Sequence, residues 1–210
     1  MSAMYNRGYF EQRSTNVDRR EWLDIKLGLR AGGARKSDRI VEVGAGTGEL
    51  SRWLAARGWR VEPCDPYAPG VPRCALPHNI PPADVYILQH VLEHVEDIEA
   101  SVETLSRAEV VVAILPGHLN DDATHHYNFF SFWDFDKIEG LFGSIRVYPI
   151  RRLVDLFARR GFRVAYAPDL WSFAAPWDLD WLLVATKRRR PRLARWLVYK
   201  AFKRIASAVV

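Results

Sequence analysis

The fold of this 210-residue chain is decided by the stretch Ile40-Val41-Glu42-Val43-Gly44-Ala45-Gly46-Thr47-Gly48-Glu49-Leu50. A short apolar run, typical of a buried strand, ends at Gly44, and helical spacing begins at Glu49. Three alternating glycines lie between them, and glycine lets the backbone approach a ligand closely. The spacing G-x-G-x-G differs from the G-x-G-x-x-G of dinucleotide-binding loops, and the Gly-Lys-Ser/Thr of a P-loop is absent. The stretch therefore predicts a strand, a ligand-binding turn and a helix, and it favours neither hydride nor phosphoryl transfer.

Apolar runs of strand length alternate with helical periodicities along the rest of the chain. Strands are expected at residues 39–43, 59–64, 84–88, 110–115, 162–167 and 181–186, the last two able to pair antiparallel. Helices are expected at residues 17–29, 49–57, 95–106, 135–142 and 150–160. The proline-rich segment 63–82 is expected to replace or distort one helix of the pattern. This alternation predicts βαβ units and a mostly parallel sheet.

An acidic residue follows the second expected strand. Asp65 lies 17 residues after Gly48, at the tip of that strand. An acid in this position accepts hydrogen bonds from the hydroxyl groups of a ribose. The segment from Glu42 to Gly48, followed by Asp65, resembles the first motif and the ribose-binding acid of class I S-adenosylmethionine-dependent methyltransferases.

Two further segments resemble motifs of the same family. Residues 84–95, DVYILQHVLEHV, are similar to the Asp-Val-x5-Val-Leu-Glu-His-Val motif of the branch that includes quinone-biosynthesis methyltransferases. Residues 126–131, HYNFFS, resemble the His-x-x-Phe-Phe-Ser/Thr segment found in many of these enzymes. The resemblance covers about residues 39–187 and implies a Rossmann-like α/β fold with a seven-stranded, mostly parallel sheet and helices on both faces.

The resemblance also implies S-adenosylmethionine as the methyl donor and a set of cofactor-binding residues. Glu42 would help to hold the amino end of the donor, and the glycines would let its methionine part lie on the backbone. The family's acid for the adenine amino group has no counterpart in Arg73-Cys74-Ala75, so this contact is expected from the backbone or from Asn79. The cofactor-binding set is Glu42, Gly44, Ala45, Gly46, Gly48, Asp65, Pro66, Gln89 and His90.

Histidines supply the candidate catalytic groups, because a methyl acceptor that is a hydroxyl needs a base. The catalytic candidates are His90 and His126, and the candidate substrate-binding residues are His118, His125, Tyr127 and Phe130. Aromatic side chains near residues 127–135 either roof an apolar acceptor or pack against the sheet. The polar loop 117–126 carries carboxylates and imidazoles, but their spacing matches no closed metal site, so no metal is expected.

Charge divides the chain into two unlike parts. Nine of its 30 basic residues follow position 186, which leaves 21 basic and 25 acidic residues before it. We expect an N-terminal arm and helix at 1–38, a methyltransferase domain at 39–186 and a basic amphipathic helix at 187–210. This helix can lie on an anionic membrane, dock on the acidic body or contact nucleic acid, the last being the least favoured.

Two cysteines, Cys64 and Cys74, are too few for a disulfide framework and show no metal-ligand spacing. A reduced, cytoplasmic protein is expected, with attachment to a membrane through its tail as an open alternative. The predicted function is methyl transfer from S-adenosylmethionine to a small-molecule or lipid-like acceptor, with oxygen slightly preferred. Two alternatives remain open: a non-catalytic donor-binding module with this fold, and an RNA methyltransferase.

Overall fold

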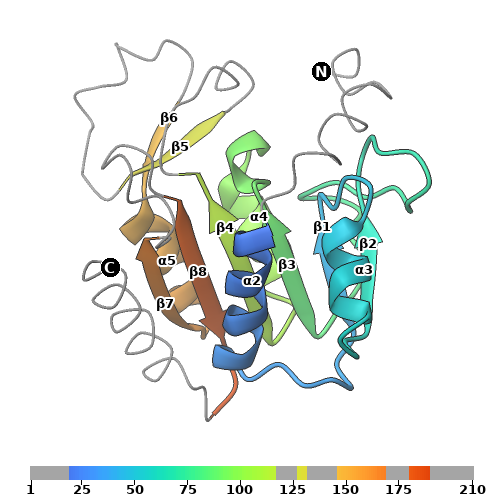
Figure 1. The fold of residues 1–210 in the computed structure, drawn as a ribbon. Helices are drawn as coiled ribbons and strands as arrows, with labels where there is room; N and C mark the ends of the chain where they lie inside the picture. The colour runs from blue at the N-terminus through green and yellow to red at the C-terminus, as the bar shows by residue number, and fades with distance from the viewer. Residues whose placement is uncertain (1–18, 117–126, 132–145, 169–179, 190–210) are drawn as a thin grey trace, which may run out of the picture.

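The structure is a computed structural model that describes residues 19–116, 127–131, 146–168 and 180–189 (Figure 1). Its main sheet has six strands in the order β2-β1-β3-β4-β8-β7. The strands are β1 (Ile40–Val43), β2 (Val61–Cys64), β3 (Val85–Gln89), β4 (Val110–Leu115), β7 (Arg163–Pro168) and β8 (Trp181–Thr186). Each lies within three residues of an expected strand. The α/β prediction is therefore confirmed.

The first four strands run parallel, and β8 pairs antiparallel with both β4 and β7. The antiparallel pairing of the last two strands was expected from the sequence. The number of strands was not, because the described residues form six strands in this sheet and not seven. Between β2 and β3 the chain has neither helix nor strand. Prolines lack the backbone N–H that both elements need, which explains why this connection stays irregular.

Among the described residues, four α-helices cover the two faces of the sheet (Figure 1). Helices α2 (Arg19–Ala31) and α3 (Glu49–Ala55) share one apolar core with alternate residues of the strands, such as Ile40 and Ile87. Helices α4 (Ile98–Leu105) and α5 (Ile150–Arg159) share the second core with the opposite residues, such as Val41 and Leu88. Successive residues of a strand point to opposite faces of the sheet. A strand made of consecutive apolar residues therefore contributes side chains to both cores.

Helix α2 lies unusually close to the sheet. A Cβ atom added at Gly28 would be 2.7 Å from Val112 Cγ1, and one added at Gly32 would be 2.6 Å from Val110 Cγ1. Any larger residue at either position would push the helix away from β4. The sequence placed this helix outside the methyltransferase domain, whereas in the structure it forms part of the first core.

A small second sheet lies beside the carboxyl ends of the main strands. It pairs β5 (Asn128–Ser131) with β6 (Arg146–Pro149) in parallel, and it was not predicted. The expected helix at 135–142 lies outside the described residues. The Asn128 side chain donates hydrogen bonds to the carbonyls of Leu92 and Val95, which ties β5 to the short helix η1 (Leu92–His94). Within the described ranges, no helix has the length and hydropathy needed to cross a bilayer.

Candidate functional site

The glycine loop joins β1 to α3 at the carboxyl edge of the sheet. Gly44, Gly46 and Gly48 have φ angles of 71°, 53° and 78°, in the left-handed region that favours glycine. A Cβ atom added at Gly44 would lie 2.5 Å from Val91 Cγ2, so this position also has no room for a side chain. A Cβ atom added at Gly46 would meet no atom within 4 Å. The backbone at Gly46 is therefore open to a ligand.

The end of β2 holds this loop in place. The Cys64 carbonyl accepts hydrogen bonds from the N–H groups of Gly44 and Ala45, at 2.9 and 3.1 Å. The Asp65 carboxylate accepts a third from the Gly46 N–H, at 2.9 Å to Oδ2. Three consecutive amides of the loop are thus fixed by two consecutive residues. The position of the glycine loop depends on how β2 ends.

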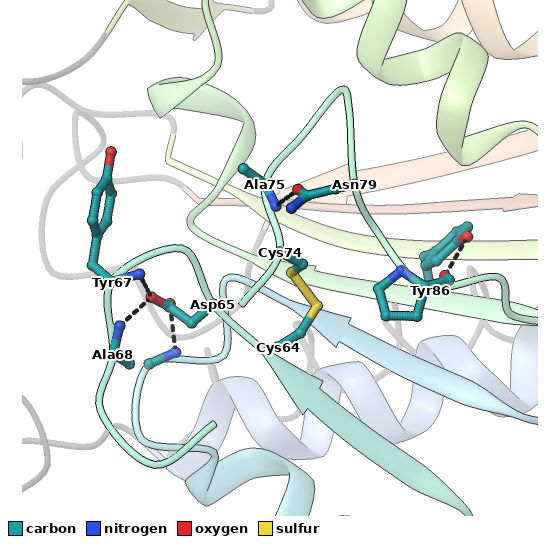
Figure 2. The surroundings of a disulfide bond; sticks show 10 residues. Cys64, Asp65, Tyr67, Ala68, Cys74, Ala75, Asn79 and Tyr86 are labelled. Atoms are coloured by element: carbon teal, nitrogen blue, oxygen red, sulfur yellow. Dashed lines mark hydrogen bonds between the residues drawn. A yellow bond between two sulfur atoms is a disulfide. The ribbon is translucent and has the colours of Figure 1, made fainter. Parts of the chain in front are cut away.

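Asp65 is buried and is held by the backbone on both sides (Figure 2). Its Oδ1 atom accepts hydrogen bonds from the N–H groups of Tyr67 and Ala68, each at 2.8 Å. A carboxylate offers about four acceptor positions, so the three backbone contacts leave one for a hydroxyl group. The placement beside Gly46 agrees with the expected ribose-binding role. Pro66, also expected at the cofactor site, follows it at the half-buried start of the loop.

A disulfide joins Cys64 to Cys74 across this loop (Figure 2). The expectation that both cysteines are reduced was wrong. That expectation was based on the number of cysteines and on the absence of a metal-binding motif. Neither shows that the proline-rich loop folds back and brings the Cα atoms of Cys64 and Cys74 to 5.5 Å from each other. A second contact closes the same loop, because the Asp65 N–H donates to the Pro72 carbonyl at 3.0 Å. The disulfide therefore closes the loop beside the residue that holds Gly46.

Glu42 lies buried beneath the glycine loop, only 3% exposed. Its carboxyl group accepts a hydrogen bond from the Ser51 hydroxyl of α3 at 2.5 Å. Burial raises the pKa of Glu42 to about 7, although the Ser51 hydrogen bonds and the charge of Arg52 act in the opposite direction. A buried carboxyl group of this kind would be stabilised in its charged form by a cation, such as an ammonium group. Contact with the amino end of the donor stays a prediction.

Gln89 ends β3, which lies next to β1 in the sheet, and His90 follows it directly. Both contact Glu21 of α2: Gln89 Nε2 donates to Glu21 Oε2, and His90 Nε2 lies 3.2 Å from the same oxygen. Asp180, just before β8, lies 4.0 Å from His90 Nε2. Among the described residues, Glu21, His90 and Asp180 form the group whose spacing suits a metal ion, with one ligand atom each within 4.8 Å of the others.

Three carboxylates surround the His90 imidazole. Glu93 Oε1 lies 3.7 Å from Nδ1, while Glu21 and Asp180 face Nε2. Burial lowers the pKa of His90, but the hydrogen bond to Glu21 and the three negative charges outweigh it and raise the pKa to about 9. An imidazolium donates hydrogen bonds and cannot accept a proton. At neutral pH the geometry thus favours His90 as a donor over the role of a base.

The remaining expected residues differ in their placement. His118, His125 and His126 lie outside the described residues. Tyr127 is half-buried, and its N–H donates to the Glu93 carbonyl at 2.7 Å. Phe130 is fully buried, with its ring centroid 6.0 Å from that of Tyr148. The structure therefore shows a packing contact for Phe130, and its contact with an acceptor stays a prediction.

Two residues of the site were missed in the sequence. Glu21 and Asp180 lie 69 and 90 positions from His90, and neither stands in a recognisable motif. On the adenine side, Asn79 Oδ1 already accepts a hydrogen bond from the Ala75 N–H at 2.6 Å, so an adenine amino group would have to share this oxygen. The Asn79 contact proposed from the sequence stays a prediction.

The described residues fit a bound S-adenosylmethionine in three respects. Gly46 offers an open backbone, Glu42 a buried carboxyl group and Asp65 a buried carboxylate. All three lie at the carboxyl ends of the adjacent strands β1 and β2. Gln89 and His90 lie at the same end of β3. Open α/β sheets bind their ligands at this edge.

Comparison with protein families agrees with this fit. The profile of a family described as a methyltransferase domain matches residues 10–167 of the chain. A comparison with curated proteins gives no significant match.

Solved structures share the fold at low sequence identity. Magnesium protoporphyrin IX methyltransferase from Synechocystis PCC 6803, crystallised with S-adenosylhomocysteine, is 17% identical with a TM-score of 0.56, covering 81% of this chain and 83% of its own. Phosphoethanolamine N-methyltransferase 2 from Haemonchus contortus, in complex with S-adenosylmethionine, is 13% identical with a TM-score of 0.55, covering 80% of this chain and 53% of its own.

A methyltransferase from Haloferax volcanii in complex with the activator Trm112 is 13% identical with a TM-score of 0.54, covering 90% of this chain and 97% of its own. The quinone-type branch stays a prediction. The family profile spans well over half of the chain, and the sheet, the glycine loop and the acid after β2 agree with it, so the chain belongs to the class I S-adenosylmethionine-dependent methyltransferases.

Proposed function

We propose that the chain transfers the methyl group of S-adenosylmethionine to a small-molecule or lipid-like acceptor. One observation carries this proposal: an open glycine loop and a cluster of titratable side chains lie at the carboxyl ends of neighbouring strands. The loop follows β1, and Gln89 and His90 lie at the carboxyl end of β3, which pairs directly with β1. A donor on the loop would thus lie beside groups that can orient an acceptor.

Each residue of the site has a distinct part in this proposal. When bound, the donor supplies an electrophilic methyl group on a sulfonium. Gly46 leaves the backbone open to it, and Asp65 offers an acceptor position to a ribose hydroxyl. Glu42 offers a buried carboxyl group to the cationic amino end. These groups bind and orient, and alignment of the reacting atoms supplies much of the rate of a transfer reaction.

An oxygen acceptor is the preferred chemistry within this proposal. A hydroxyl acceptor must lose a proton, which calls for a base. His90 is cationic at neutral pH, so this base would come from another group. Residues 117–126 follow β4, whose carboxyl end adjoins that of β3, and three histidines lie among them. His126 is the candidate that we retain from the sequence for this step.

The donor half of the proposal is tested by calorimetry with S-adenosylhomocysteine on the folded full-length chain. We expect binding, and at least a tenfold loss in the Gly46→Val variant, whose side chain would fill the open backbone. The matched control is Glu99→Gln, which changes an exposed carboxylate of α4 that pairs with Arg152, and it should leave binding unchanged. Absence of binding to the folded wild-type chain at millimolar concentration would contradict the proposal.

The acceptor half is tested by the transfer of a labelled methyl group. The chain is incubated with labelled donor and either a small-molecule extract, a lipid extract or total RNA. We expect labelled product from one of the first two and none from RNA. Product from RNA alone would support the RNA methyltransferase, and donor binding without turnover in any extract would support the non-catalytic module.

A further inference from the structure

Glu21, in the first turn of α2, contacts both Gln89, the last residue of β3, and His90, which follows it. Its Oε2 atom accepts a hydrogen bond from Gln89 Nε2 and lies 3.2 Å from His90 Nε2. The carboxylate is 15% exposed and the His90 side chain 26% exposed, so both are partly shielded from water. A charge-assisted contact in such surroundings is stronger than one on the surface.

The helix that carries Glu21 has a fixed position on the sheet. Gly28 and Gly32 bring α2 against β4 and β8. At its other end, the Thr186 hydroxyl donates to the Gly32 carbonyl at 2.8 Å, and the Arg188 guanidinium donates to the Gly33 carbonyl at 2.6 Å. A helix fixed by close packing and by two side-chain hydrogen bonds holds its first turn in one place.

The backbone of His90 is also adapted to this contact. Among the described residues, His90 is the one non-glycine residue with a positive φ, 53°. Its N–H donates to the Ile114 carbonyl at 3.1 Å, which keeps the residue attached to the edge of β4. A non-glycine residue in the left-handed region is strained and persists where the surrounding structure holds it, often at a functional site.

We propose that Glu21 is a positioning residue of the methyl-transfer site, holding Gln89 and His90 in the orientation in which they face the donor and the acceptor. This inference rests on the proposed function, because it takes these two residues as part of the transfer site. Glu21 acts through them and touches neither reactant. Helix α2 thereby belongs to the active site, although it precedes the glycine loop in the chain.

The electrostatic consequence of this contact can be measured. The groups that face the His90 imidazole are Glu21 from α2, Glu93 from η1 and Asp180 before β8. Of these, Glu21 makes the hydrogen bond that raises the pKa most. Removing its charge should therefore lower the pKa of His90 more than removing any one of the other charges.

The experiment compares Glu21→Gln, Glu21→Asp and the control Glu99→Gln in the full-length chain. The pKa of His90 is measured by NMR titration of its ring protons in the presence of a chelator, and the signal is assigned by its loss in His90→Gln. Affinity for S-adenosylhomocysteine is measured by calorimetry on the same samples. Thermal unfolding shows that each variant is folded.

We expect Glu21→Gln to lower the pKa of His90 from about 9 by at least one unit and to weaken S-adenosylhomocysteine binding about tenfold. Glu21→Asp keeps the charge and should recover part of both effects. Glu99→Gln, whose partner is the exposed Arg152, should change neither.

A folded Glu21→Gln variant with wild-type pKa and wild-type affinity would overturn the inference. If Glu21→Gln does not fold, the inference rests on Glu21→Asp, and a wild-type pKa and affinity in that variant would overturn it. Failure of the wild-type chain to bind S-adenosylhomocysteine would instead contradict the proposed function, and the titration would still show whether Glu21 controls His90. The two failures are therefore distinguishable.

Discussion

Opening the Cys64–Cys74 disulfide is expected to destabilise the chain and to weaken donor binding. The bridge closes a loop between residues separated by 10 positions. Its first cysteine accepts hydrogen bonds from Gly44 and Ala45, and the next residue, Asp65, accepts one from Gly46. Reduction leaves these hydrogen bonds possible but lets the unfolded chain sample many more conformations.

The size of the effect follows from the length of the loop. In the chain-entropy treatment, a closed loop of this length contributes about 2.7 kcal/mol to the free energy of unfolding. One kcal/mol shifts the Tm of a domain of 150–250 residues by about 2–4 °C. Reduction should therefore lower the Tm by about 5–10 °C. Donor affinity should fall several-fold, because ordering of the loop is then coupled to binding.

The assay measures the Tm and the affinity for S-adenosylhomocysteine with and without reductant, after the free thiols have been counted. The Cys64→Ala/Cys74→Ala variant is the control: it should resemble the reduced protein and should not respond to reductant. A Tm change below about 1 °C in a sample with two titrated thiols would refute the reasoning, because the bridge would then contribute nothing to the folded loop.

Three further predictions concern the loop, the carboxyl group beneath it and the tail. Gly44→Ala should lower the Tm more than Gly46→Ala, because both positions have positive φ but only the first would bring a Cβ atom within 2.5 Å of Val91; equal shifts would show that the clash relaxes at no cost. The pKa of Glu42 is 4.5 in the unfolded chain and about 7 in the folded chain, so the folded chain binds this proton more tightly. The free energy of unfolding therefore falls as the pH rises from 4.5 to about 7, by about 3 kcal/mol in total. Glu42→Gln should therefore stabilise the donor-free chain at pH 8 but not at pH 4.5 in denaturant titrations, while weakening S-adenosylhomocysteine binding; an equal gain at both pH values would contradict the burial argument. Flotation with anionic vesicles should be lost in a chain that ends at Arg189, and equal flotation of both chains would exclude the tail as a membrane contact.

This last truncation keeps residues that the structure ties to the body. Arg188 donates to the Gly33 carbonyl and lies 2.8 Å from Asp38, and Lys187 donates to the Ser106 carbonyl. The charge count had placed the start of the tail at 187. A chain that ends there would lose the Arg188 contacts with Gly33 and Asp38. A change in its flotation would then not distinguish a loss of stability from a loss of membrane binding.

Local signals account for the segments that the structure places where the sequence predicted them. The glycine loop and the end of β3 each lie within one continuous segment, so the pattern of apolar residues, glycines and acids shows their placement directly. The same holds for helix α4. The side chain of Asp97 caps it by accepting from the Ala100 N–H at 2.9 Å, so it starts at Ile98, three residues after the predicted start.

Long-range contacts account for the parts that were not predicted. The partner of Cys64 depends on the path of a loop with no regular structure, and the number of strands depends on whether that loop pairs with the edge of the sheet. The contact of Phe130 with Tyr148 in the core was not predicted either, because it depends on the pairing of β5 with β6, which no local pattern predicts.

The amino-acid sequence was enough to predict the fold class, the family and the strand ends at which we propose that the donor binds, because periodicity and motif spacing are properties of short segments. Only the folded chain places Glu21 and Asp180 beside His90 and makes this histidine a cation, since residues 69 and 90 positions away meet there. The protonation state of a side chain depends on the charges and solvent around it in space. That environment is created by helix α2 and strand β8 when they pack on the sheet.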